Sequence, residues 1–103
     1  MTLNLEERHR EQIRAILGQH LGGRKGVRVY AYGSRVRGNA HRFSDVDLAI
    51  ESAQPIGVDL LFALRNAFDG SNLPYSVDVT DLAHATPSFR TSFDRNRELL
   101  FET

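Results

Sequence analysis

The sequence contains no cysteine. Disulfides and cysteine-ligated zinc sites are therefore excluded, and we expect a cytoplasmic protein. No apolar run approaches the roughly 20 residues that span a bilayer, so we expect no association with a membrane. The first residues, MTLNLEERHREQ, are polar and acidic, which is not typical of a signal peptide. The formal net charge is +0, so we do not expect the molecule as a whole to bind nucleic acid directly.

The chain has 103 residues, of which 41% are hydrophobic and 25% are charged. This size and composition are typical of one globular unit, and we expect residues 1–103 to form a single domain. The charge is uneven, because residues 24–44 include basic side chains and no acidic ones. The basic residues are Arg24, Lys25, Arg28, Arg35, Arg37 and Arg42. The acidic residues resume at Asp45.

Helical spacing of apolar residues predicts helices over 5–21, over 58–69 and from residue 87 onward. Gly22 and Gly70 follow the first two segments, where glycine commonly ends a helix. Thr86 before Pro87 is typical of an N-cap followed by the first helical position. Alternating apolar residues predict strands over 27–33, 45–51 and 75–81. Together these elements predict an α+β (α/β-like) fold, in which helices flank a small mixed β-sheet.

Two acidic residues, Asp45 and Asp47, stand at the head of the second predicted strand. Strand side chains alternate between the two faces of a sheet. Both acids therefore share the face opposite the apolar residues of that strand, which are Val46, Leu48 and Ile50. In the third strand, Asp78 lies between Val77 and Val79, so it also points away from the core. If these two strands are neighbours, the three carboxylates converge.

Such a cluster of carboxylates needs a counter-charge. Two carboxylates about 4 Å apart repel each other by roughly 4 kcal/mol at an effective dielectric constant of about 20. Carboxylate oxygens are the ligands that magnesium and manganese prefer, so we predict a metal site made by Asp45, Asp47 and Asp78. The simpler alternative is that these acids are solvent-exposed strand residues without a common role. Glu51 lies farther along the same face and is interpreted as a peripheral charge.

A Gly-Ser pair, Gly33-Ser34, ends the first predicted strand. Glycine is favoured where a chain reversal requires a positive φ. The following backbone N–H groups and the Ser34 hydroxyl are suited to hold phosphate oxygens, with Arg35 and Arg37 supplying positive charge beside them. The GxxxxGK[ST] pattern of a Walker loop is absent. A Gly-Ser pair alone is also a common turn.

The combination of these motifs points to one protein family more specifically than any single motif does. Gly33-Ser34, ten intervening residues and Asp45-Val46-Asp47 resemble the G-S-x10-D-x-D signature of the nucleotidyltransferase superfamily related to DNA polymerase β. Asp78 resembles the third carboxylate of that superfamily. The short chain and its GSRVRG spelling are similar to the minimal nucleotidyltransferase (MNT) branch, whose members often act as antitoxins of HEPN-domain toxins.

The resemblance implies a role for each matching residue. Gly33 and Ser34 would hold the terminal phosphates of the nucleotide, with Arg35 and Arg37 at positions that are often basic. Asp45 and Asp47 would ligate two Mg²⁺ ions (Mn²⁺ is an alternative), and Asp78 would ligate the catalytic ion and help to activate the acceptor hydroxyl. The activity implied is transfer of AMP from ATP to a hydroxyl of a HEPN toxin. The chain would then be the antitoxin of a type VII-like toxin–antitoxin pair.

Two other functions stay open at this stage. The chain could neutralise its partner by contact alone, with or without a bound nucleotide. Tyr30 and Tyr32 are available for such contacts, although we expect them to pack against the sheet. The chain could instead modify a small molecule such as an aminoglycoside, but nothing in it resembles the helical extension with which larger relatives bind such acceptors.

Overall fold

The computed structural model of the chain describes residues 6–33, 45–95 and 97–103. Its elements follow in the order α1 (Glu7–Leu21), β1 (Arg28–Tyr32), β2 (Val46–Glu51), α3 (Val58–Asp69), β3 (Val77–Asp81), a 3₁₀ turn (Leu82–His84), α4 (Pro87–Arg95) and β4 (Arg97–Glu102). Among these helices, none combines the length and the hydropathy needed to cross a membrane.

The strands form one mixed sheet in the order β3-β2-β1-β4. The pair β2–β3 is parallel, whereas β1 pairs with β2 and with β4 in the antiparallel sense. The predicted α+β fold, with a small mixed sheet flanked by helices, is confirmed. The two strands that carry the predicted carboxylates are direct neighbours, which was the condition for bringing those acids together.

The sequence analysis missed β4, which follows α4 and pairs with β1. In this pairing Val29 lies opposite Phe101 and Tyr30 lies opposite Leu99, so Leu100 is an extra residue on β4. Such a bulge places two successive residues against one and interrupts the alternation by which a strand is recognised in a sequence. Leu100 is buried in the main core.

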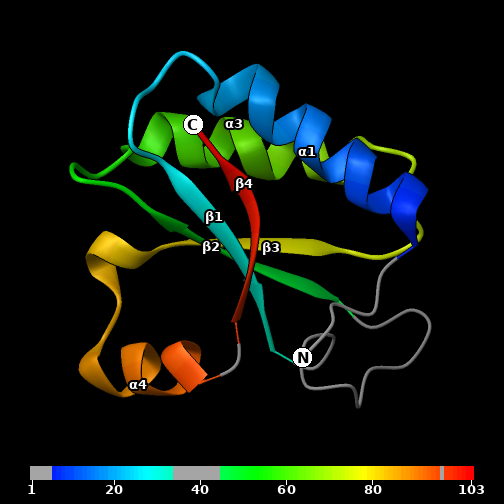
Figure 1. The fold of residues 1–103 in the computed structure, drawn as a ribbon. Coiled ribbons are helices and arrows are strands. Elements are labelled where there is room, and N and C mark those ends of the chain that lie inside the picture. Colours follow the sequence, from blue (N-terminus) through cyan, green and yellow to red (C-terminus); the bar gives the residue numbers. More distant parts are fainter. Residues whose placement is uncertain (1–5, 34–44, 96) are drawn as a thin grey trace.

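The main core lies between the sheet and the pair of helices α1 and α3, which Figure 1 shows together on one side of the strands. Burial alternates along β3, and on β2 the residues Val46, Leu48 and Ile50 belong to this core. Ala49 on β2 is also buried, but it belongs to a second cluster on the opposite face. Side chains at helical spacing on α1 and α3 complete the core because each helix presents one apolar face. The fully buried members include Ile13, Leu17, Leu21, Val46, Leu48, Ile50, Leu64 and Val79.

Helix α4 covers part of the opposite face of the sheet, on the other side of the strands in Figure 1. It begins as predicted, with the Phe89 backbone N–H donating to the Thr86 hydroxyl at 3.2 Å and Pro87 in the first helical position. Phe93 is 2% exposed and packs with Tyr30 in a second, smaller apolar cluster. This face of the sheet is therefore only partly open.

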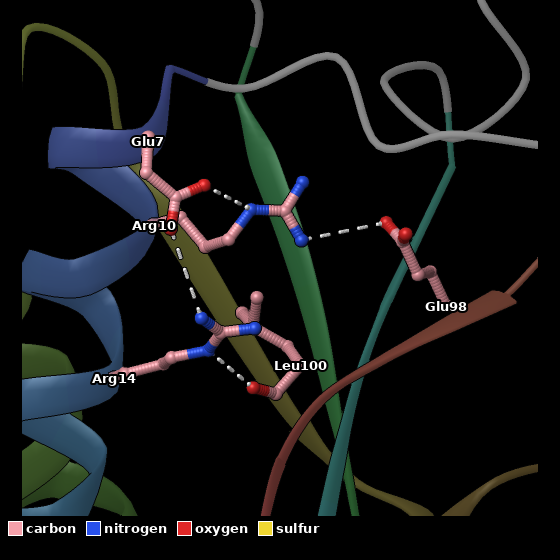
Figure 2. A network of polar contacts seen from close by, with 5 residues as sticks. All are labelled: Glu7, Arg10, Arg14, Glu98 and Leu100. Atoms are coloured by element: carbon pink, nitrogen blue, oxygen red, sulfur yellow. Dashed lines mark hydrogen bonds and ion pairs between the residues drawn. The ribbon is translucent and has the colours of Figure 1, made fainter.

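Helix α1 is fastened to the edge strand β4 by a polar network (Figure 2). The Arg14 Nε donates to the Leu100 carbonyl at 2.9 Å, which satisfies a backbone group at the bulge. Arg10 lies between Glu7, at 3.6 Å, and Glu98, at 4.0 Å. These contacts cover an edge that would otherwise present unpaired backbone groups to solvent.

Candidate functional site

The three adjacent strands β1, β2 and β3 place one polar row across the sheet. Tyr32 on β1 is the register partner of Asp47 on β2, and Asp47 is in turn the partner of Asp78 on β3. Side chains at paired positions project from the same face of a sheet. Asp47 is half-buried and Asp78 is exposed. Two of the three predicted carboxylates are thus fixed side by side by strand register alone.

Gly33 follows β1 and lies directly against this row. Its φ is +85°, so the positive value expected for this glycine is confirmed. A Cβ added at this position would lie 2.5 Å from Oδ2 of Asp47, closer than side-chain carbons approach an oxygen. The positive φ therefore favours glycine here, and an added Cβ would push the Asp47 carboxylate aside. The backbone at Gly33 thus lies close to the Asp47 carboxylate as it is placed in this structure.

The third predicted carboxylate, Asp45, is exposed and comes immediately before β2. Within the residues that the structure describes, no three His, Asp or Glu side chains are arranged to hold one metal ion. The joint ligation by Asp45, Asp47 and Asp78 therefore stays a prediction. The chemistry of these residues still suits a cation such as Mg²⁺, because the available ligands are carboxylate oxygens. The backbone of Gly33 lies close beside them.

Tyr32 belongs to this site, although the sequence analysis expected it only to pack against the sheet. Burial of its half-exposed side chain raises the pKa of the phenol above its usual value, and interaction with the Thr80 side chain partly opposes that rise. The negative charges of Asp47 and Asp78 raise the same pKa further. The phenol is therefore a neutral hydrogen-bonding group next to two carboxylates. The position of Tyr32 directly before Gly33 was the signal that could have revealed it.

The remaining predicted site residues, Ser34, Arg35 and Arg37, lie outside the described residues. Their proposed contacts with phosphate stay predictions.

Asp81, at the end of β3, shows what a purely structural carboxylate looks like in this fold. It is 6% exposed and faces the core side. Its Oδ1 accepts from the Ala83 backbone N–H at 3.0 Å, and its Oδ2 accepts from the Ile56 N–H at 3.3 Å. Backbone donors thus satisfy both oxygens, whereas Asp78, three residues earlier, is exposed on the opposite face.

Comparison with protein families places this site in a known group. The family model "Polymerase beta, Nucleotidyltransferase" matches residues 11–103. The chain belongs to this nucleotidyltransferase family. The match includes Gly33, Asp45, Asp47 and Asp78, so the polar row on the sheet lies in a nucleotidyltransferase domain, and the resemblance drawn from the sequence is confirmed.

A curated relative supports a closer relationship within the nucleotidyltransferases. The chain is 45% identical over 62 residues to "Probable protein adenylyltransferase MntA" of Haemophilus influenzae. The matched segment covers 60% of this chain and 54% of the relative. The chain thus matches about half the length of that relative.

Solved structures show the same nucleotidyltransferase fold. A chain in the crystal structure of a toxin–antitoxin with AMP-PNP superposes with a TM-score of 0.74 at 26% identity, over 91% of this chain and 73% of that one. A chain in a structure of a tri-AMPylated HEPN toxin of Shewanella oneidensis in complex with an MNT antitoxin gives a TM-score of 0.69 at 19% identity, over 96% and 74% of the two chains. The second likeness shows the fold alone.

Proposed function

We propose that this chain is a magnesium-dependent adenylyltransferase that transfers AMP from ATP to a hydroxyl group of a partner protein. The proposed partner is a HEPN toxin, and this chain is its antitoxin. The observation that carries the proposal is the placement of Gly33 against Asp47, which pairs with Asp78 across β2 and β3. A phosphate-binding turn and metal-binding carboxylates must meet in this way for a nucleotide to be held between them.

The proposed metal site uses Asp45, Asp47 and Asp78. Bound Mg²⁺ would neutralise triphosphate charge and lower the pKa of the acceptor hydroxyl. The chain's own contribution is to hold the carboxylates in place on paired strands. The Gly33-Ser34 backbone, with Arg35 and Arg37, is proposed to bind the terminal phosphates.

The proposed reaction forms one bond and breaks one. The acceptor oxygen attacks the α-phosphorus of ATP, its proton passes to a base such as the Asp78 carboxylate, and the bond from that phosphorus to the pyrophosphate oxygen breaks. The products are the AMP-modified protein and pyrophosphate. Most of the catalytic effect in such a site comes from positioning and electrostatic stabilisation rather than from covalent participation of the protein.

The identity of the acceptor is supported by the relatives. One is named as a protein adenylyltransferase, and one solved neighbour contains a tri-AMPylated HEPN toxin bound to its MNT antitoxin. A structural neighbour with AMP-PNP supports ATP as the nucleotide. Because ATP is the proposed donor, the cytoplasm is the proposed compartment.

The experiment is intact-mass spectrometry of a HEPN toxin encoded beside this chain, incubated with the chain, ATP and Mg²⁺. We expect mass increases in steps of one AMP, which Asp47→Asn abolishes. Glu51→Gln is the matched control, because Glu51 lies on the same face of β2 but pairs with Arg28 at 3.9 Å, away from the site. A toxin that is neutralised without any mass increase would overturn the proposal and show that contact alone is the mechanism.

A further inference from the structure

The Tyr32 side chain crosses the middle of the sheet. Tyr32 stands on β1, yet its phenol interacts with the side chain of Thr80 on β3. Strand β2 lies between these two strands. Neighbouring strands are about 4.8 Å apart, so the ring must extend over β2 to reach β3. The side chain therefore starts beside Asp47 and runs diagonally toward Thr80, close enough to Asp47 and Asp78 for their charges to act on the phenol.

The crossing is possible because β2 offers a small side chain on that face. Ala49 is two residues after Asp47 and shares its face. Its register partners are Tyr30 on β1 and Thr80 on β3. Ala49 is 0% exposed and belongs to the apolar cluster against which Tyr32 packs. A larger residue at this position would occupy the space over which the Tyr32 ring passes.

Helix α4 fixes the other side of the same ring. Phe89 and Phe93 contact it edge to face, with centroid distances of 5.3 Å and 5.7 Å. These two rings stack on each other at 6.2 Å. Edge-to-face packing restricts the orientation of an aromatic ring. The ring of Tyr32 is thus held by α4, by Ala49 and by Thr80.

We propose that Tyr32 is a positioning residue for the Asp47–Asp78 pair. This inference rests on the proposed function, because it assigns to Tyr32 the support of the metal-binding carboxylates. Two carboxylates fixed side by side by strand register repel each other, and their side chains spread unless neighbours restrict them. The clamped ring holds the Tyr32 hydroxyl next to both carboxylates, and this hydroxyl limits how far they spread. Groups that orient metal ligands in this way commonly change metal affinity by about 10- to 100-fold when they are removed.

The test is calorimetric titration of the chain with Mn²⁺–AMP-PNP, which measures binding and not turnover. Tyr32→Phe keeps the ring and removes only the hydroxyl. We expect it to weaken binding of the metal–nucleotide complex by about 10-fold. The affinity for AMP-PNP in EDTA should stay within about twofold of that of the unaltered chain, because the nucleotide pocket itself is not changed.

The matched control is Tyr30→Phe. Tyr30 belongs to the same aromatic cluster and contacts Phe93 at 5.5 Å, but its register partner on β2 is Ala49 rather than a carboxylate. Its substitution should leave Mn²⁺–AMP-PNP binding unchanged. Ala49→Val is the second variant, since it should displace the Tyr32 ring without altering any polar group and weaken binding in the same direction. Melting temperatures confirm that each variant is folded.

The outcomes separate this inference from the proposed function. If Asp47→Asn loses Mn²⁺–AMP-PNP binding while Tyr32→Phe binds as tightly as the unaltered chain, Tyr32 is only a packing residue and the inference is wrong. An equal loss for Tyr32→Phe with and without the metal would also overturn it, because the effect would then be a general distortion. If Asp47→Asn binds Mn²⁺–AMP-PNP normally, the proposed metal site is itself wrong and the role of Tyr32 falls with it.

Discussion

On β2, Asp47 and Leu48 are neighbours in sequence but lie on opposite faces of the sheet. Leu48 is fully buried beneath α1 and α3, whereas Asp47 is half-buried beside Asp78 and Tyr32. The core face is apolar apart from Asp81 at the end of β3. The other face is divided, with the α4 aromatic cluster over one part and the carboxylates over the next. On these strands, the side chains on one face therefore pack into the core, and the side chains on the other face include the proposed metal-binding carboxylates.

The largest effect on stability is expected on the core face. Leu48→Ala should lower the free energy of unfolding by about 2–5 kcal/mol, because it removes buried methyl groups and leaves a cavity. Urea-induced unfolding measures this. The control is Leu99→Ala on β4, where Leu99 is 43% exposed and should cost much less. Equal losses for the two variants would contradict the assignment of the faces.

The next largest effect is expected on the rate of AMP transfer, at the point where Gly33 lies against the polar row. Gly33→Ala should reduce the rate of AMP transfer by about 100-fold, because the new Cβ displaces the Asp47 carboxylate. Gly57→Ala is the matched control, since Gly57 has a similar φ of +90° but no atom within 4 Å of an added Cβ. It should lose stability from the same backbone strain and keep its activity. If both variants transfer AMP at the same rate, the close approach to Asp47 has no role.

A smaller effect on stability, an increase rather than a loss, is expected from substitution of Asp78. Asp78→Asn should raise the free energy of unfolding in EDTA by about 0.2–1 kcal/mol, because it removes a like-charge neighbour of Asp47. The same variant should lose AMP transfer. Glu11→Gln on α1, which is exposed and away from the helix ends, tests whether removal of any acid has this effect. A destabilised Asp78→Asn would show that the carboxylate pair is not a site of repulsion.

The smallest expected effect is on the stability of the fold at alkaline pH. The pKa of Tyr32 is raised in the folded state, mainly by burial, so the unfolded chain gives up this proton at lower pH than the folded chain does. Stability associated with the neutral phenol is therefore present below about pH 10 and is lost as the pH rises through the folded-state pKa. Urea unfolding from about pH 9 to 11 should show a shallower decline for Tyr32→Phe than for the unaltered chain. Parallel declines would contradict the raised pKa.

Local patterns predicted much of this fold. The alternation of Val46, Leu48 and Ile50 identified β2 and the face of its acids, because burial on one side of a strand has a period of two. The positive φ of Gly33 and the start of α4 at Thr86-Pro87 were also predictable, since turn and cap preferences depend on a few neighbouring residues.

The features that were missed depend on contacts between distant segments. The strand β4 was not recognised because the bulge at Leu100 breaks its alternation. The path of Tyr32 over Ala49 to Thr80 requires the register of three strands, which no local pattern encodes. The place of Asp45 relative to the other two carboxylates also depends on such long-range geometry, and its convergence with them, inferred from strand alternation and from the family resemblance, stays a prediction.

The most direct test of the central claim is a crystal structure of the chain with Mn²⁺ and AMP-PNP, with the metal located by its anomalous scattering. The account predicts anomalous peaks bounded by the carboxylates of Asp47 and Asp78, with the triphosphate between them and the backbone that follows Gly33. A nucleotide bound elsewhere, with no metal at Asp47 or Asp78, would contradict it.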